Sequence, residues 1–168
     1  ALFSIFGMII ARILAAWGPV PIAVQRVGSQ IEAISWMTAG GFSTALSAFT
    51  GQNYGAMKFD RIKKGYYAAL AVMGSIGLFA SLLLITIPGP IFHIFIQEKG
   101  TLPLGIDYLR ILGYSQLFMC IEITTGGAFN GLGRAYIPAI VSIVWNALRI
   151  PLALFLSSKA ILGLNGIW

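Results

Sequence analysis

The sequence contains long stretches that carry one charged residue or none, and clusters of charged residues separate them. Charged residues make up 10% of the 168 residues, and hydrophobic residues make up 58%. Soluble domains carry about 25% charged residues. Because a soluble helical core would need a polar face on every helix, the pattern indicates an all-α polytopic membrane protein.

The apolar stretches have the length of membrane-spanning helices, which need about 20 residues each. We expect five complete transmembrane helices at about residues 1–17, 22–50, 62–87, 104–132 and 137–157, and the start of a sixth at 161–168. Pro and Gly mark the breaks, as in Pro88-Gly89-Pro90, because Pro removes a backbone donor and clashes with the preceding turn. Together the helices form one transmembrane domain over residues 1–168.

The two ends of the chain suggest that it is a piece of a longer protein. It begins at Ala1 without Met and stops at Trp168 inside an apolar stretch. Residues 1–17 lack the charged region and cleavage site of a signal peptide, so we interpret them as the remainder of a spanning helix.

The net charge of +6 comes from basic residues that lie mostly between the apolar stretches. This placement favours topology control and anionic lipid headgroups over a nucleic-acid partner. The links 51–64 and 133–136 hold five basic residues against two in the alternate links, which predicts that both are cytoplasmic in a plasma (inner) membrane. If Arg26 and Arg110 count as outer-end residues, the contrast falls to five against four.

Small residues recur at four-residue spacing in two of the expected helices. One stripe is formed by Ala39, Ser43, Ser47 and Gly51, and another by Gly127, Gly131 and Ala135. Such stripes let helix backbones approach closely within lipid, so bundle packing is the simpler interpretation. A functional alternative is that thin helices leave room for a central cavity.

Two acidic residues, Glu32 and Glu122, lie inside apolar stretches. A carboxylate at bilayer depth costs several kcal/mol, so it needs a partner or a water-filled cavity. The neighbours of Glu32 on its helical face are small and polar, apart from the aromatic side chain of Trp36. The face of Glu122 includes Ser115, Phe118, Thr125, Gly126 and Phe129. Either carboxyl could bind a proton or cation, or serve as a structural, paired group.

Arg149 lies in the middle of the last complete helix, on one face with Ser142 and Asn146. A buried guanidinium stays charged, so it needs an acid or carbonyl partner, and Glu32 or Glu122 could supply the acid. A structural ion pair and a contact with substrate both remain open for this residue. For Arg12, in the first helix, the same two roles remain open.

The sequence lacks the patterns of enzymes and of metal sites. It contains no phosphate loop, no His-Glu-x-x-His and no Gly-x-Ser-x-Gly. Its single cysteine, Cys120, and its single histidine, His93, cannot build a metal cluster. We therefore predict no catalytic residue, no metal site and no enzyme activity.

Six segments stand in a characteristic order and spacing: Gln-Ile-Glu-Ala-Ile-Ser-Trp-Met (30–37), GGFSTALSAFTGQNYG (40–55), Tyr108-Leu109-Arg110-Ile111, the Gly127–Arg134 region with Pro138, Arg149-Ile150-Pro151, and LGLNGIW (162–168). As an ordered set they resemble the multidrug and toxic compound extrusion (MATE) transporters. The resemblance implies twelve helices in two six-helix lobes. Arg149-Ile150-Pro151 looks like the C-terminal lobe, so the chain would lack its N-terminal lobe partner.

The resemblance also implies a function. Such transporters export cationic and amphipathic compounds in exchange for Na⁺ or H⁺, without a cofactor. Coupling ions would bind at Glu32, which is similar to an acid of many members, and at Glu122, which lies about one turn from an Asp of some members. The expected substrate cavity is lined by Gln30, Trp36, Phe129, Asn146 and Arg149.

Two other functions are compatible with the sequence. The first is a lipid-linked saccharide flippase of the same superfamily. That function would call for a strongly cationic cavity, and this chain supplies only Arg12 and Arg149 for one. The second is a non-transporting membrane scaffold, which predicts that Glu32 and Glu122 face only packed side chains.

Overall fold

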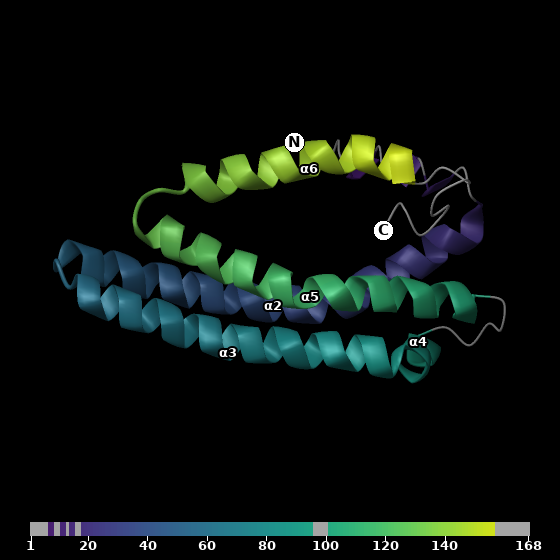
Figure 1. Ribbon diagram of the computed structural model, residues 1–168, viewed down its shortest axis with the longest axis horizontal. Coiled ribbons are helices and arrows are strands. Elements are labelled where there is room, and N and C mark those ends of the chain that lie inside the picture. Colours follow the sequence, from purple (N-terminus) through teal and green to yellow (C-terminus); the bar gives the residue numbers. More distant parts are fainter. Residues whose placement is uncertain (1–6, 9–10, 13, 16–17, 96–100, 157–168) are drawn as a thin grey trace.

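The computed structural model describes residues 7–8, 11–12, 14–15, 18–95 and 101–156. Five helices make up the long described parts: α2 (Pro19–Gly55), α3 (Phe59–Thr86), α4 (Pro88–Phe95), α5 (Leu102–Gly131) and α6 (Tyr136–Leu156). Figure 1 shows α2, α3 and α5 side by side, with α6 running back along the other side of α5. The described residues are thus all-α, as the sequence predicts.

Four of the observed helices correspond to ranges that the sequence predicts. The range 22–50 corresponds to the longer α2, and 62–87, 104–132 and 137–157 correspond to α3, α5 and α6. The short helix α4 was not expected, because Pro88-Gly89-Pro90 was interpreted only as a stop. Pro is well suited to a first helical turn, and here it begins a helix. Most of 1–17 and all of 161–168 lie outside the described residues.

The structure bears out the expectation of five spanning helices only in part. Among the described residues, α3 alone is both long and apolar enough to cross a membrane by length and composition. α2 is diluted by Gly, Ser, Thr and Gln, and α5 carries Asp107, Arg110 and Glu122. Several hydroxyls of α2 bond to its own backbone; Thr38 and Thr44, for example, donate to carbonyls four residues earlier.

Among the described residues, α2 and α5 pack closely against each other through the two small-residue stripes. A Cβ atom added at Gly127 would overlap the carbonyl oxygen of Ser43, and one at Gly131 would overlap that of Ser47. Both helices therefore run in the same direction with their backbones in contact. This is the bundle-packing interpretation of the stripes; Ala135, by contrast, lies beyond the end of α5.

α3 runs antiparallel to α5 and packs on it through a second set of small residues. A Cβ atom at Gly77 would meet Cys120 at 3.0 Å, and one at Gly113 would lie 3.3 Å from the carbonyl oxygen of Ser81. Near the other end of α5, Gly105 receives the fully buried ring of Phe92 from α4. α4 thereby closes the end of the three-helix core.

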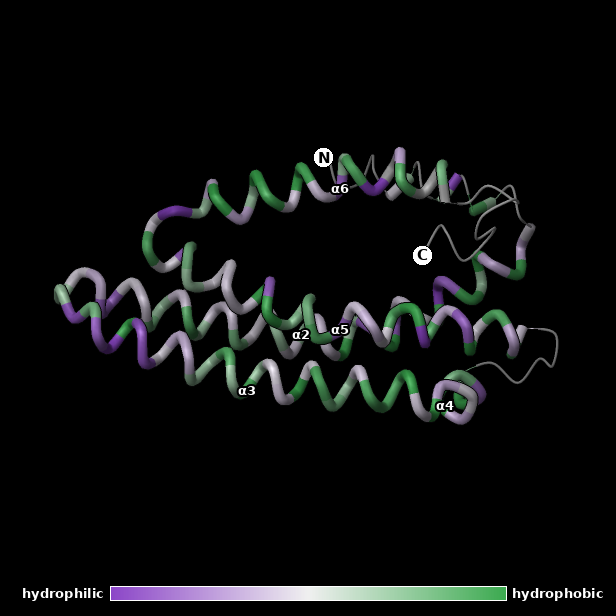
Figure 2. The backbone as a smooth tube through the Cα atoms, viewed as in Figure 1, coloured by the Kyte–Doolittle hydropathy of each residue, from purple (hydrophilic) through white to green (hydrophobic). Residues whose placement is uncertain are grey.

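α6 is attached much more loosely than the other helices. After α5 the chain reverses through Gly133, whose φ of 73° lies in the left-handed region that glycine adopts without strain. α6 then contacts α5 at few positions, and most of its described side chains are exposed. Figure 2 shows that hydrophobic residues are spread along its length.

The α2–α5 contact leads to a first prediction. Gly127→Ala should destabilise the protein by about 1–3 kcal/mol, because the added methyl group has no room beside Ser43. The apparent melting temperature of the purified protein, measured by a thiol-independent unfolding assay, should fall by several degrees.

The neighbouring Gly126→Ala variant is the matched control. A Cβ atom there would lie 3.7 Å from Pro138, an ordinary contact, so its melting temperature should stay at the wild-type value or rise. Equal melting temperatures for the two variants would contradict the close packing of α2 on α5.

Candidate functional site

Glu32 faces a cavity of about 500 Å³ between α2, α5 and α6. The carboxyl group is half-buried on α2. Nine residues line the cavity, and they combine opposite charges, hydroxyl groups and aromatic rings: Gln25, Glu32, Tyr108, Ile111, Leu112, Tyr114, Ser115, Phe118 and Arg149. This mixture suits a ligand with both charged and aromatic parts.

The walls of the cavity follow from the helix packing. Gly28, one turn before Glu32, leaves room for the ring of Tyr108, which an added Cβ atom would overlap. Tyr108 is therefore held against α2, directly beside the turn that carries Glu32. Ile111, Ser115 and Phe118 follow along the same face of α5.

The charge balance of the cavity depends on two side chains. Arg149 of α6 lies close enough to interact electrostatically with Glu32 and with Tyr108. Attraction between the opposite charges is strong in a low-dielectric setting. Arg149 therefore supplies a favourable opposite charge for the Glu32 carboxylate.

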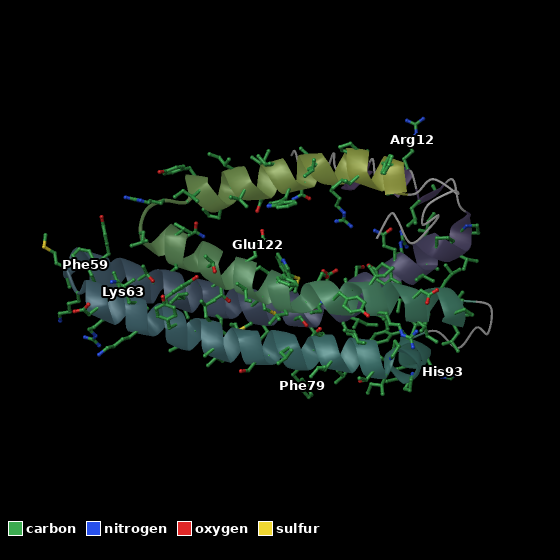
Figure 3. The ribbon with its side chains drawn as sticks, viewed as in Figure 1. Arg12, Phe59, Lys63, Phe79, His93 and Glu122 are labelled. Carbon is green, nitrogen blue, oxygen red and sulfur yellow. The ribbon has the colours of Figure 1, made fainter. Side chains whose placement is uncertain are left out.

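Glu122 lies in a different place. It lines a separate cavity of about 240 Å³ between α5 and the first turns of α6, together with Thr125, Phe129 and Pro138. Figure 3 shows its side chain on the side of α5 that faces α6. The hydroxyl of Ser142 donates a long hydrogen bond of 3.5 Å to Glu122 Oε1. The two carboxyl groups therefore belong to two sites.

The other predicted cavity residues are distributed unevenly. Arg149 lines the Glu32 cavity and Phe129 the Glu122 cavity. Asn146 lies between them on α6, and its amide donates to the Ser142 carbonyl oxygen at 2.8 Å. Gln30 and Trp36 are exposed on α2 and line neither cavity.

The sequence analysis missed five residues of the Glu32 cavity, of which Ile111 and Leu112 are aliphatic and Gln25, Tyr108 and Tyr114 carry polar groups. Gln25 lies seven residues before Glu32, so helical spacing could have found it. Tyr108 and Tyr114 come from α5, and nothing in the sequence indicates which part of α5 lies beside Glu32.

Arg12 and His93, two other residues considered in the sequence analysis, line neither acidic cavity. In Figure 3 the side chain of Arg12 points away from α5, and His93 lies at the α4 end of the bundle. Among the described residues, no three His, Cys, Asp or Glu side chains lie close enough to hold a metal ion.

Comparison with known proteins identifies the family. The family model described as MatE matches residues 1–155. The chain therefore belongs to the MATE family, whose members are transporters rather than enzymes.

Curated relatives agree with this assignment at low identity. The chain is 28% identical to a probable multidrug resistance protein NorM of Thermotoga maritima, over 99% of this chain and 36% of that protein. It is 26% identical to multidrug and toxin extrusion protein 1 of Danio rerio, over 88% of this chain and 25% of that protein. The chain thus spans about a third of the length of the first relatives that it matches.

A solved structure agrees on the fold. The chain superposes on a MATE protein crystallised in complex with MaD5 with a TM-score of 0.89 and 15% sequence identity. The match covers 99% of this chain and 38% of that one. The helices described above therefore have the arrangement of part of a MATE transporter.

The cavity leads to a second prediction, on water access. In the complete gene product, Ser115→Cys should react with a water-soluble thiol reagent, because residue 115 is exposed to the Glu32 cavity. The native Cys120 is fully buried and should stay unmodified in the same sample. Mass spectrometry of the labelled peptides distinguishes the two positions. Protection of the introduced thiol in a folded protein would mean that the cavity is filled or closed.

Proposed function

We propose that the chain is one lobe of a secondary active transporter that exports amphipathic or cationic drugs and toxic compounds by antiport with Na⁺ or H⁺. The observation that carries the proposal is the cavity at Glu32, where an acid on α2 faces open space rather than packed side chains. Intramembrane acids that line a cavity are typical of ion and proton pathways. The relatives named as multidrug resistance proteins support the same function.

Glu32 is the proposed coupling residue. When the site is empty, Arg149 across the cavity supplies a counter-charge for the carboxylate. When a proton or Na⁺ binds, the carboxyl group no longer needs that partner. The ion thus competes with the guanidinium for one acid, which links ion binding to the position of α6. Glu122, beside the turn into α6, is a second candidate in its own cavity.

The aromatic rings are the proposed contacts for substrate. Tyr108, Tyr114 and Phe118 surround the acid in the Glu32 cavity, and flat cationic compounds are attracted to such rings. In the proposed assembly, the chain is the C-terminal lobe of a twelve-helix protein in the plasma (inner) membrane. The absent N-terminal lobe would complete the cavity, and the links 51–64 and 133–136 would be cytoplasmic.

The cavities favour this function over the two alternatives. A scaffold without transport predicts that Glu32 and Glu122 face only packed side chains, yet each lines a cavity. A saccharide flippase calls for a strongly cationic cavity, whereas Arg149 is the one basic residue in the lining at Glu32 and it stands opposite an acid.

The coupling role is tested by Glu32→Gln in the complete gene product, reconstituted into liposomes. Uptake of ethidium driven by an imposed Na⁺ or proton gradient should fall at least tenfold, because the amide keeps the size of the side chain but cannot bind the coupling ion. Gradient-driven fluorescence change is the measurement. A Glu32→Gln protein that transports at the wild-type rate would refute the coupling role.

Asp107→Asn is the matched control, since it removes an acid from the same lobe. Asp107 is exposed near the start of α5 and lines neither acidic cavity. Transport by this variant should stay within twofold of wild type. An equal loss in both variants would point to a general effect of charge on the lobe.

A further inference from the structure

A third cavity lies between the start of α3 and the end of α5; it shares Thr125 and Phe129 with the Glu122 cavity, but neither Glu32 nor Glu122 lines it. It measures about 250 Å³, and its wall is formed by Ile62 and Tyr66 of α3 with Ala128, Phe129 and Leu132 of α5. Drug-sized ligands usually occupy pockets of about 300–1,000 Å³. This groove is smaller and almost wholly apolar, so it fits a narrow aliphatic chain.

The two helices are joined at the groove by one hydrogen bond between side chains. The hydroxyl groups of Tyr66 and Thr125 lie 3.1 Å apart. In this bond one hydroxyl donates and the other accepts, which lowers the polarity of the lining and suits an apolar occupant.

The mouth of the groove is basic. Lys63 is part of the lining, and its aliphatic stem can lie along the apolar wall while its ammonium group reaches outward. Four more exposed basic residues lie at the same end of the two helices, against the single acid Asp60: Lys58, Arg61, Lys64 and Arg134. Figure 3 shows Lys63 at this end, and Figure 2 shows the concentration of hydrophilic residues there.

The length of α3 places Lys63 near a membrane surface. α3 has 28 residues, which corresponds to roughly 42 Å at about 1.5 Å per residue. The hydrocarbon core of a bilayer is about 30 Å thick, so roughly 12 Å of α3 extends beyond it. The charged residues of α3 all lie in its first turns, between Asp60 and Lys64. This end therefore lies at the level of the lipid headgroups.

The outer surface of α3 is suited to lipid contact. Phe79 and Leu82 are 67% and 53% exposed, and a small share of the apolar window of α3 is buried against other helices. The groove is formed by the first turns of the same helix, at Ile62, Lys63 and Tyr66.

From these observations we propose that the groove between α3 and α5 binds an anionic phospholipid, with an acyl chain against Ala128 and Phe129 and the phosphate at Lys63. The apolar wall matches the chain and the basic mouth matches the headgroup. The proposal depends on the membrane location of the chain and not on ion coupling at Glu32.

The test measures lipid retained by the complete gene product. The protein is purified in detergent, exposed to equal amounts of phosphatidylglycerol and phosphatidylcholine, and examined by native mass spectrometry. Lys63→Gln should lower the preference for phosphatidylglycerol about fivefold, which corresponds to about 1 kcal/mol for one basic residue near a membrane. Lys63→Arg should keep the preference.

Lys64→Gln is the matched control, because Lys64 is the next residue of α3 and does not line the groove. It removes the same charge and should change the preference less than twofold. Equal losses in Lys63→Gln and Lys64→Gln would overturn the proposed site and leave only a general attraction of the basic end.

A second variant tests the apolar part of the groove. Ala128→Leu fills the space for the acyl chain, so retention of both lipids should fall, whereas Ala135→Leu, in the exposed turn after α5, should have no effect. Unchanged retention in Ala128→Leu would overturn the proposal, and it would indicate that another helix of the complete protein occupies the groove. Before lipid retention is compared, both alanine variants are checked to be monodisperse and to have the same melting temperature.

Discussion

The contact between the backbones of α2 and α5 determines how the rest of the described chain is arranged. Within lipid, apolar side chains gain little by leaving one apolar medium for another, so helices associate through close packing. At Gly127 and Gly131 the carbonyl oxygens of Ser43 and Ser47 occupy the space that a side chain would need. A shift by one residue would bring Ala128 or Leu132 against those carbonyls, and the register is therefore fixed.

This register decides which residues of α5 are available to form sites. One face of α5 is buried against α2 and α3, through residues such as Gly113, Cys120 and Thr124. The remaining surface contributes to three cavities: Ser115 and Phe118 to the first, Glu122 to the second, and Ala128 and Leu132 to the third. α5 is thus the element that all three cavities share; α2 and α6 complete the first, α6 the second and α3 the third.

The sequence predicted the features that depend on a single helix. The all-α class follows from the distribution of charges, and the close approach of helices follows from the small-residue stripes. The face of Glu122 was also predicted as a continuous row, and its members do lie along the cavities of α5. Helical spacing suffices for such statements because it depends only on local geometry.

The features that depend on two helices could not be predicted in the same way. Tyr108 lies beside Glu32 because Gly28 leaves room for its ring. The contact between positions 28 and 108 depends on the register of α2 against α5, which the sequence does not indicate. Trp36 was selected as a neighbour of Glu32 on α2, but the rotation of α2 against α5 leaves it 60% exposed. Glu32 and Glu122 line separate cavities for the same reason: their relative position depends on how the helices pack against one another.

The position of α6 connects packing to the proposed mechanism. α2, α3 and α5 form a closely packed unit, whereas α6 contacts α5 at only a few positions. The loosely attached helix nevertheless supplies Arg149, the counter-charge of Glu32. Moving α6 would therefore change the electrostatic environment of Glu32 while leaving the α2–α5 contact intact. For an antiporter this separation is useful, since a carboxylate that loses its guanidinium partner gains affinity for a cation, and the rigid part of the lobe holds that carboxylate in place.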